Sequence, residues 1–389
     1  MITPARKIVE TLSKAGFTAY YAGGWVRDFL LGHPSDDIDI ATNAPPETVQ
    51  ALFDKTIPIG LSFGIILVVL DGHQYEVATF RRDFDYSDGR RPQRVEFSGA
   101  VEDAKRRDYT INGMFYDPIR EQILDYVGGQ QDLKQGLIRA IGNPHERIRE
   151  DRLRMIRGVR LACRFGFRLD PATADAIRAH ASELFPAVAI ERVWQELEKS
   201  RLFLPQMLLR LHEFGLLQAI FPELPAKIDP RPLPEGAPLI ASLIALLPHS
   251  TFDERMALCK RLKASNHELE FAAFLTRTEV LLQRIPEPID WAHLYAHHDG
   301  WLVLQILQPS QMSEHTQRRA QLNSWVERIQ HRNPVVTSAH LIAAGVKPSP
   351  QMGLLLREAE RIACNHNLED ASAVLTRLVL NNDTLRDQI

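Results

Sequence analysis

The chain has 389 residues, 45% of them hydrophobic and 24% charged, and its formal net charge at pH 7 is −3. This composition is typical of folded soluble proteins, and the length exceeds what one hydrophobic core usually serves, so we expect two or more domains. The small negative charge excludes a uniformly basic nucleic-acid-binding protein. Any contact with nucleic acid must therefore use local basic patches.

Membrane insertion and disulfide bonding are both disfavoured. The longest apolar run, residues 238–247, is too short to span a bilayer, and the N-terminus has the pattern of an amphipathic helix rather than of a signal peptide. The three cysteines, Cys163, Cys259 and Cys364, are widely spaced without a metal-ligand pattern. We therefore expect a cytoplasmic protein with reduced, packed cysteines and no membrane partner.

The first 140 residues are dominated by short runs of β-branched and aromatic residues, which predict the strands of one mixed sheet. Helices are expected over residues 5–15 and 46–53. After residue 140 helical spacing continues almost without interruption, apart from a connector over residues 221–238 that contains six prolines. The predicted strands are residues 18–21, 38–41, 63–70, 75–80, 95–97 and 123–127.

Two basic segments lie in the first half of the chain. Residues 147–168 hold eight arginines and only two acids, and apolar residues recur there at helical intervals, which places the arginines on a stripe beside a packed face. A charge run is most often a solvated helix face, but this spacing also suits contact with phosphate or base. The second segment contains Arg81, Arg82, Arg90, Arg91, Arg94, Lys105, Arg106 and Arg107.

A pair of aspartates, Asp37 and Asp39, follows a turn that contains Gly23 and Gly24. Residues two apart on a strand share a face, so the pair would present two carboxylates to hard cations such as Mg²⁺. Glycines let the backbone approach a triphosphate, and Arg27 adds a forked donor. Taken alone, the pair is equally compatible with a solvated strand end or a turn cap.

Six motifs follow one another in order along the chain. They are Gly23-Gly24-x-x-Arg27-Asp28, Asp37-x-Asp39, Arg106-Arg107-Asp108-x-x-x-Asn112, Asp125-x-x-x-Gly129-x-x-Asp132-Leu133, Glu150-Asp151-x-x-Arg154 and Glu191-Arg192-x-x-x-Glu196-Leu197. Together they resemble the class II tRNA nucleotidyltransferase and bacterial poly(A) polymerase family. The resemblance covers residues ~20 to ~200, is thin between 200 and 335, and returns weakly over residues 341–350. In this tail region Ser349 and the preceding pair Ser338-Ala339 depart from the family pattern.

The resemblance implies an α+β fold with an N-terminal nucleotidyltransferase head and an all-helical remainder. The head, residues 1–140, would contain a polymerase-β-like mixed sheet; a helical neck, 141–220, would recognise the base, and a helical body and tail, 221–389, would bind the acceptor arm of tRNA. The implied activity is template-independent addition of CCA, or of its terminal A, to tRNA 3′ ends from CTP and ATP by two-metal phosphoryl transfer. No oligomeric state follows from it.

The resemblance also assigns the carboxylates of the head. Asp37 and Asp39 would be catalytic residues and would hold Mg²⁺, and Asp36, which stands where the family often has a basic residue, is the less suitable partner because it does not share the strand face of Asp39. Glu76 is the candidate third catalytic carboxylate. Its alternative is an ordinary outward-facing strand glutamate.

Nucleotide binding is assigned to residues of three motifs. Asp108 would accept from ribose hydroxyls, although a salt-bridged helix start is the alternative for this motif. Asp151 and Arg154, at i and i+3 of a helix, would present an acceptor and a donor to the edge of cytosine or adenine; an i,i+3 surface ion pair is the alternative. The full set is Gly23, Gly24, Arg27, Arg107, Asp108, Asn112, Asp151, Arg154 and Arg157.

The remaining features refine this assignment. Residues 84–92 have the composition of a flexible loop, and its presence favours addition of adenosine. The motif around Glu191 and Arg192 is interpreted as structural support for the base-recognising helix, through ion pairing and packing of Val193, Trp194 and Leu197. The set His293, His297, His298 and Asp299 is interpreted as a solvated histidine cluster rather than as a metal site or a phosphohydrolase site.

Two other functions are weighed against tRNA nucleotidyl transfer. A bacterial poly(A) polymerase shares the head motifs but typically carries a basic C-terminal extension, which this chain lacks. A catalytically silent RNA-binding protein of the same fold is disfavoured by the intact Asp37 and Asp39.

Overall fold

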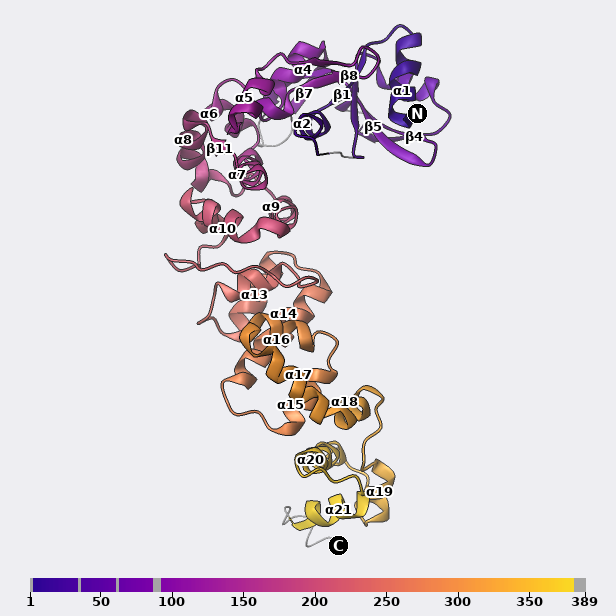
Figure 1. The fold of residues 1–389 in the computed structure, drawn as a ribbon, viewed down its shortest axis with the longest axis vertical. Helices are drawn as coiled ribbons and strands as arrows, with labels where there is room; N and C mark the ends of the chain where they lie inside the picture. The colour runs from indigo at the N-terminus through magenta and orange to yellow at the C-terminus, as the bar shows by residue number, and fades with distance from the viewer. Residues whose placement is uncertain (1–2, 34–35, 61–62, 87–91, 381–389) are drawn as a thin grey trace. The chain divides into compact units, whose positions relative to one another are not determined.

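The computed structural model describes residues 3–33, 36–60, 63–86 and 92–380 (Figure 1). By its internal contacts the chain divides into two compact units, Met1–Pro232 and Leu233–Ile389. The boundary lies in the predicted proline-rich connector, between helix α11 (Leu216–Ile220) and helix α12 (Ile240–Ala245). Each unit is described by itself. Among the described residues, every helix falls short of the length and apolar content that a membrane span needs.

A seven-stranded mixed sheet organises the N-terminal part of the first unit, which confirms the predicted α+β class. The strand order is β3-β4-β5-β2-β1-β8-β9, in which β2 and β5 are parallel and all other neighbours are antiparallel. The strands are β1 (Ala19–Ala22), β2 (Asp39–Thr42), β3 (Thr56–Gly60), β4 (Ile65–Leu70), β5 (His73–Thr79), β8 (Phe115–Asp117) and β9 (Gln122–Leu124).

The prediction of a single sheet is wrong for one strand. Residues 95–97 belong to β7 (Pro92–Phe97), which pairs only with β6 (Arg81–Tyr86) in a separate two-stranded antiparallel ribbon. Residues 84–86 and 92, which were expected to belong to a flexible loop over 84–92, are strand instead, and residues 87–91 lie outside the described part of the chain. Alternation in sequence identifies a strand, but the partner of that strand depends on the tertiary fold.

Two predicted helices cover one face of the sheet. Helix α1 (Pro4–Lys14) and helix α3 (Pro46–Leu52) contribute buried apolar side chains to a cluster that also contains Ile40 of β2 and Val77 of β5. Because side chains alternate along a strand, Asp39 and Glu76 point to the opposite face. Three short helices were not predicted: α2 (Gly24–Leu30), α4 (Ala100–Arg106) and α5 (Gly129–Gln135).

The second half of this unit is helical and packs directly on the sheet region. Tyr109 is buried and donates from its hydroxyl to the backbone carbonyl of Arg154, and a Cβ on Gly158 would lie 2.2 Å from that hydroxyl, so the glycine admits the ring. The two-residue strands β10 (Leu137–Ile138) and β11 (Arg168–Leu169) pair in parallel. The helices are α6 (Pro144–Glu150), α7 (Leu153–Phe165), α8 (Pro171–His180), α9 (Ile190–Glu198), α10 (Leu204–Glu213) and α11.

The second unit is helical throughout its described residues. Its core includes Leu341 and Val346, which lie on either side of Gly345; the amide of Val346 donates to the carbonyl of Leu341, and Gly345 has φ +93°. This is a left-handed helix C-cap, and it explains the glycine in the weak C-terminal motif. The helices are α12, α13 (Phe252–Arg261), α14 (Asn266–Leu282), α15 (Pro288–Ala296), α16 (Gly300–Leu307), α17 (Met312–Gln321), α18 (Asn323–Gln330), α19 (Ser338–Ala343), α20 (Met352–Asn365) and α21 (Ala371–Leu380).

Candidate functional site

The glycine turn lies at the end of β1 and opens helix α2. Gly23 has φ +71°, a left-handed conformation that favours glycine, and Ala22 before it pairs with Asp39 of β2. A Cβ on Gly23 would lie 3.0 Å from Nη1 of Arg107, and a Cβ on Gly24 would lie 3.4 Å from Nη2 of Arg27. The two glycines therefore admit two guanidinium groups close to the backbone of the turn.

Asp39 and Glu76 lie side by side on the face of the sheet that α1 and α3 do not cover. The parallel register pairs Ile40 with Val77, so the residues immediately before them, Asp39 and Glu76, are adjacent. Asp37 precedes β2 and Asp39 is its first residue, so the two aspartates are not both strand residues, as the prediction of a shared strand face assumed. The chain enters the strand only at Asp39.

Asp37 nevertheless acts electrostatically on Asp39. Desolvation, repulsion from Glu76 and repulsion from Asp37 raise the pKa of Asp39 to about 6, and Arg107 opposes this shift. Asp36 instead raises the pKa of Tyr75, after the larger effect of burial. Among the three acidic residues of this segment, Asp37 is thus the one that shares the surroundings of Asp39 with Glu76.

This set of carboxylates fits a divalent cation. The carboxylates of Asp37, Asp39 and Glu76 together form a set of hard oxygen donors. A bound cation would offset the repulsion from Asp37 and Glu76 that contributes to the raised pKa of Asp39. The chemistry of the donors therefore matches the divalent metal ions that nucleotidyltransferases generally use.

A hydrogen-bonded chain links the glycine turn to helix α7. Arg27 is buried, and its Nη1 donates to Oδ1 of Asn112 at 2.5 Å. Nδ2 of Asn112 donates to Asp108 at 3.1 Å, and Nε of Arg157 donates to Oδ2 of Asp108 at 2.9 Å, while Nη2 of Arg157 lies 2.7 Å from the same oxygen as an ion pair. Predicted nucleotide-binding residues from two separate motifs are joined in this way to Arg157.

Asp108 is held in its charged form. Desolvation alone would raise its pKa, but the Arg157 guanidinium and the Asn112 amide outweigh desolvation and hold the pKa well below its usual range. The amide of Tyr109 also donates to Oδ1 of Asp108, at 2.8 Å. A carboxylate offers about four acceptor positions, and these three hydrogen bonds together with the close ion-pair contact of Nη2 of Arg157 leave none of them open.

Arg107 lies at the C-terminal end of α4, where its Nε and Nη2 both donate to Oδ2 of Asp103, at 3.1 and 3.0 Å. Asp103 is only 1% exposed, and the guanidinium also lies 4.9 Å from the centre of the Phe115 ring. This motif was weighed as a salt-bridged helix start. The ion pair between Arg107 and Asp103 is present, but it lies at the end of a helix rather than at its start. It holds the guanidinium of Arg107 beside Gly23.

The predicted helical spacing of Asp151 and Arg154 is wrong. Asp151 is the C-cap of α6, with φ −146°, and its Oδ1 accepts from the amide of Leu153 at the start of α7. Arg154 is in the first turn of α7 and donates to Glu150 at 2.7 Å and to two backbone carbonyls. The chain changes direction between the two helices, so both side chains reach one cavity from a junction rather than from one helix face.

Arg192 of α9 is a site residue that sequence reasoning missed. Its Nη1 and Nη2 donate to the two carboxylate oxygens of Asp151, at 3.1 and 2.8 Å. The motif was recognised, but its arginine was assigned to structural support. The neighbouring Glu196 fulfils the supporting role, since it is 3% exposed and accepts from Nε of Arg160 at 2.5 Å.

One cavity of about 410 Å³ collects these side chains, a volume in the range of small-molecule sites. Ten of the twelve predicted site residues line it; Asp37 and Glu76 do not. Seven lining residues are arginines and three are aspartates, which suits a polyanion such as a triphosphate. The lining consists of Gly23, Gly24, Arg27, Asp39, Arg106, Arg107, Asp108, Asn112, Asp151, Arg154, Arg157, Arg160, Leu161 and Arg192.

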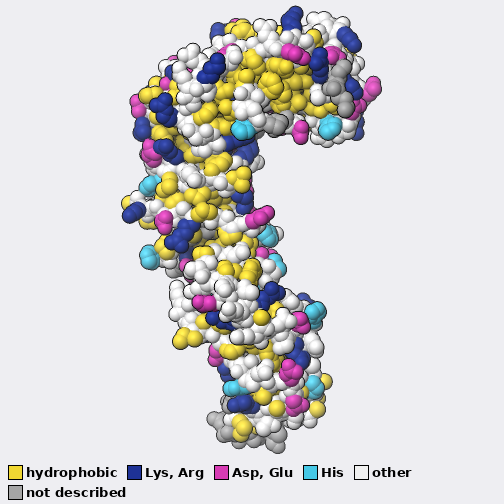
Figure 2. All heavy atoms as spheres, viewed as in Figure 1, with side chains coloured by type: hydrophobic (Ala, Val, Ile, Leu, Met, Phe, Trp, Pro, Cys, Tyr) yellow, Lys and Arg dark blue, Asp and Glu magenta, His cyan; other side chains and the backbone are white. Residues whose placement is uncertain are grey.

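This cavity is rich in arginine, although the chain as a whole is not basic. On the face seen in Figure 2, basic and acidic side chains are interspersed over the surface, in keeping with the net charge of −3. The cavity is therefore a basic site on a protein of balanced charge, as the two basic segments of the sequence predicted.

Comparison with known proteins identifies the family. Residues 19–139 match the family described as the Poly A polymerase head domain, and residues 166–227 match the probable RNA and SrmB-binding site of polymerase A. The CCA-adding enzyme of Lacticaseibacillus paracasei is 35% identical over 374 residues, which cover 91% of this chain and 90% of that enzyme. This chain belongs to the CCA-adding enzymes. The resemblance to class II tRNA nucleotidyltransferases is thereby confirmed.

Two further comparisons show that sequence identity is highest over half of the chain, whereas structural similarity extends over nearly all of it. The CCA-adding enzyme of Staphylococcus saprophyticus is 49% identical over 196 residues, but this match covers only 50% of the chain and 49% of that enzyme. The crystal structure of the Bacillus stearothermophilus CCA-adding enzyme in complex with CTP has a TM-score of 0.78 and 29% identity, and it covers 99% of this chain and 98% of that one. The fold is therefore shared over nearly the whole length.

Proposed function

We propose that this chain adds CCA, or completes it with the final adenosine, at the 3′ end of tRNA, using CTP and ATP. The observation that carries this proposal is the shared cavity, in which the carboxylate Asp39, the glycine turn and the junction of α6 and α7 meet. A nucleotide bound there would have its phosphates near the turn and its base near Asp151 and Arg154.

We assign the metal as Mg²⁺, with Asp37 and Asp39 as ligands and Glu76 as the third carboxylate. When bound, the ion neutralises the triphosphate and lowers the pKa of the RNA 3′-hydroxyl. In the reaction the RNA 3′-oxygen forms a bond to the α-phosphorus while the bond from that phosphorus to the bridging oxygen breaks, and pyrophosphate leaves. Arg27 and Arg107 hold the phosphates beside the turn.

Selection of ribose depends on Asp108. Because the acceptor positions of Asp108 are filled by Tyr109, Asn112 and Arg157, a ribose hydroxyl can be accepted only when one of these donors moves. The donor that can then turn to the ligand is Arg157, which would reach a phosphate or the base. In this proposal, binding of the nucleotide is therefore coupled to release of Arg157 from Asp108.

Selection of the base depends on the junction of α6 and α7. Contacts from Leu153 and Arg192 occupy about three of the four acceptor positions of Asp151 and leave Oδ2 able to accept an exocyclic amine. Arg154 would donate to the ring nitrogen or carbonyl oxygen of the same edge. Cytosine and adenine place an exocyclic amine directly beside a ring nitrogen that can accept, whereas uracil has no exocyclic amine and the ring nitrogen beside the amine on the Watson–Crick edge of guanine carries a proton.

The two helical regions that follow the head and neck are proposed to bind the acceptor arm of tRNA. We place the reaction in the cytoplasm, because Cys163, Cys259 and Cys364 are all free thiols. The retained segment between β6 and β7 favours a product that ends in adenosine.

The experiment that tests this function uses two tRNA substrates, one ending at the discriminator base and one ending in CC, each with Mg²⁺ and with CTP, ATP or both. Three added residues followed by a stop establish CCA addition. A single adenosine added only to the CC substrate makes the protein an adenosine-adding enzyme. A long ladder of adenosines refutes the tRNA assignment in favour of poly(A) synthesis, and no incorporation favours a silent RNA-binding protein.

A further inference from the structure

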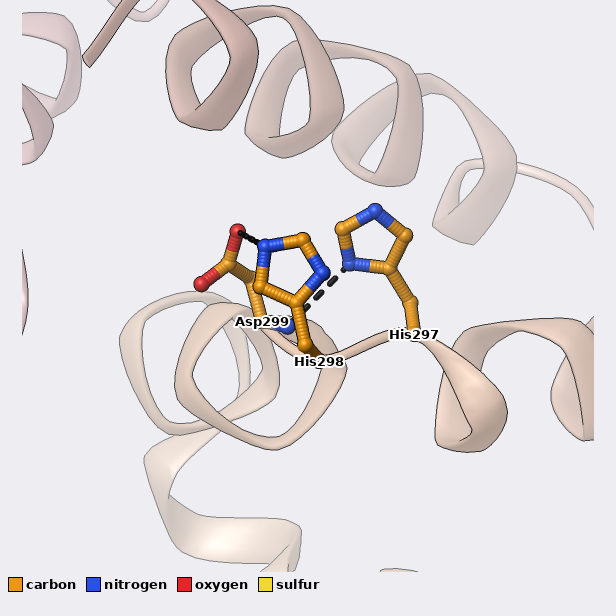
Figure 3. A group of neighbouring side chains, drawn as sticks. All are labelled: His297, His298 and Asp299. Carbon is orange, nitrogen blue, oxygen red and sulfur yellow. Dashed lines mark hydrogen bonds and ion pairs between the residues drawn. The ribbon is translucent and has the colours of Figure 1, made fainter. Parts of the chain in front are cut away.

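The turn between α15 and α16 brings together His297, His298 and Asp299 (Figure 3). These residues were expected to form a solvated cluster, and for His297 that expectation is wrong. Its ring is half-buried and stacks on Phe274 of α14, with ring centroids 3.6 Å apart and planes 14° apart. The side chain is therefore fixed in place rather than free in solvent.

The three side chains offer a mixed nitrogen and oxygen donor set. Two imidazole nitrogens and one carboxylate oxygen all lie within 4.8 Å of one another. Among the described residues, three or more His, Cys, Asp or Glu side chains come together at this spacing in this group. The His297 and His298 rings stack with centroids 4.4 Å apart, and Nε2 of His298 lies 3.0 Å from Oδ2 of Asp299. Figure 3 shows both rings and the carboxylate on the same side of the turn.

The backbone holds these groups in position before any ligand binds. The amide of Asp299 donates to Nδ1 of His297 at 3.1 Å, and the amide of Gly300 donates to the carbonyl of His297 at 2.9 Å. A Cβ on Gly300 would lie 1.7 Å from the carbonyl oxygen of Leu294, so only glycine permits this tight approach. The turn is therefore already ordered, and a metal bound at Nδ1 of His297 would replace the hydrogen bond from the amide of Asp299, because that nitrogen has a single lone pair.

We propose that His297, His298 and Asp299 form a second metal site, selective for a borderline divalent cation such as Zn²⁺. Imidazole nitrogen suits zinc, nickel and copper, whereas Mg²⁺ prefers an all-oxygen set such as the head carboxylates. Ligand atoms of a tetrahedral zinc lie roughly 3.3 Å apart, since metal–nitrogen bonds are about 2.0–2.1 Å long. Nε2 of His298 and Oδ2 of Asp299 already lie 3.0 Å apart, and a bound metal would draw the three ligand atoms, now within 4.8 Å of one another, to that spacing while water completes the coordination.

Zinc at this site would tie the turn to α14, because His297 contacts Phe274 across the two elements. The expected consequence is stabilisation of the second unit without a change in Mg²⁺-dependent chemistry. This proposal is independent of the assigned catalytic reaction.

The test uses the full chain without a polyhistidine tag, in excess Mg²⁺ so that the head carboxylates are occupied. Zinc binding is measured by calorimetry and by competition with a chromophoric chelator. The double variant His297→Gln/His298→Gln removes both nitrogens, and Asp299→Asn removes the carboxylate. The matched control is His293→Gln, because His293 lies on the same segment but pairs with Glu360 at 3.2 Å instead of joining the cluster.

We expect the wild type and His293→Gln each to bind one equivalent of zinc. The double variant and Asp299→Asn should bind zinc at least tenfold more weakly. Co²⁺ bound to the wild type should give the visible absorption spectrum of a tetrahedral site. At zinc concentrations about 100 times Kd, the unfolding midpoint of the wild type should rise by roughly 5–10 °C. The site is refuted if the double variant binds zinc as tightly as the wild type, or if neither protein binds any. Circular dichroism of each variant without zinc verifies that it is folded.

Discussion

Replacing Asp39 with asparagine keeps the size of the side chain and removes one of three mutually repelling carboxylates. Desolvation, with added repulsion from Glu76 and Asp37, raises the pKa of Asp39 to about 6 from 3.8. A carboxyl group with a raised pKa destabilises the folded protein when it is charged. Asp39→Asn should therefore abolish catalysis and, without divalent cations, make the protein more stable at neutral pH.

The magnitude follows from the shift. Two pKa units correspond to about 3 kcal/mol, but the Asp39 side chain is exposed and solvent screens the repulsion, so we expect about 1 kcal/mol. In a unit of this size that raises the unfolding midpoint by roughly 2–4 °C. The wild type binds an extra proton when folded between about pH 4 and 6, so its stability falls as the pH rises through that window. The variant lacks this fall.

The assay is thermal unfolding in a chelator at about pH 4 and about pH 7.5, together with tRNA extension in Mg²⁺. We expect equal midpoints at the lower pH, a higher midpoint for Asp39→Asn at the higher pH, and activity reduced at least ~100-fold. Asp36→Asn is the matched control and should retain activity. A variant that is less stable than the wild type near pH 7.5, or a difference that does not change with pH, would refute the reasoning.

Three further predictions concern the rest of the cavity. Arg154→Ala should raise KM for CTP and ATP by roughly 10–100-fold, with folding unchanged by circular dichroism, because one base contact is typically worth about 1–3 kcal/mol. Arg192→Ala should increase misincorporation of UTP and GTP relative to CTP in single-turnover assays, because Asp151 loses its orienting partner; unchanged selectivity would contradict this role. Asp108→Asn should lower the unfolding free energy near pH 7 by about 3 kcal/mol, because Arg157 loses a buried charge partner. Since the depressed pKa of Asp108 stabilises the fold above about pH 4 and this is lost on acidification, the gap between variant and wild type should close below that pH in urea titrations.

Local sequence predicted what depends on neighbours along the chain. The helices expected over residues 5–15 and 46–53 are α1 and α3, because amphipathic spacing and an N-terminal proline are local signals. The proline-rich connector likewise contains the boundary between the two units. The motif series was recognisable because its residues recur in a family, and ten of the twelve proposed site residues line one cavity.

The errors arose where a side chain acts across the fold. Asp151 was placed on a helix with Arg154, but its strongest partner is Arg192, 41 residues away, and the partner of Asp108 is Arg157, 49 residues away. Spacing along the chain holds no information about such pairs. Residues 95–97 of β7 were assigned to the main sheet for the same reason.

The sequence by itself determined the family, the strand and helix character of most segments, and the identity of the charged groups at the site. Only the tertiary structure decided which of those charges meet. It filled the acceptor positions of Asp108, left one on Asp151, and set Glu76 beside Asp39 through the parallel register. The physical reason is that the identity of a donor or acceptor is a property of the residue, whereas its availability depends on every element packed around it.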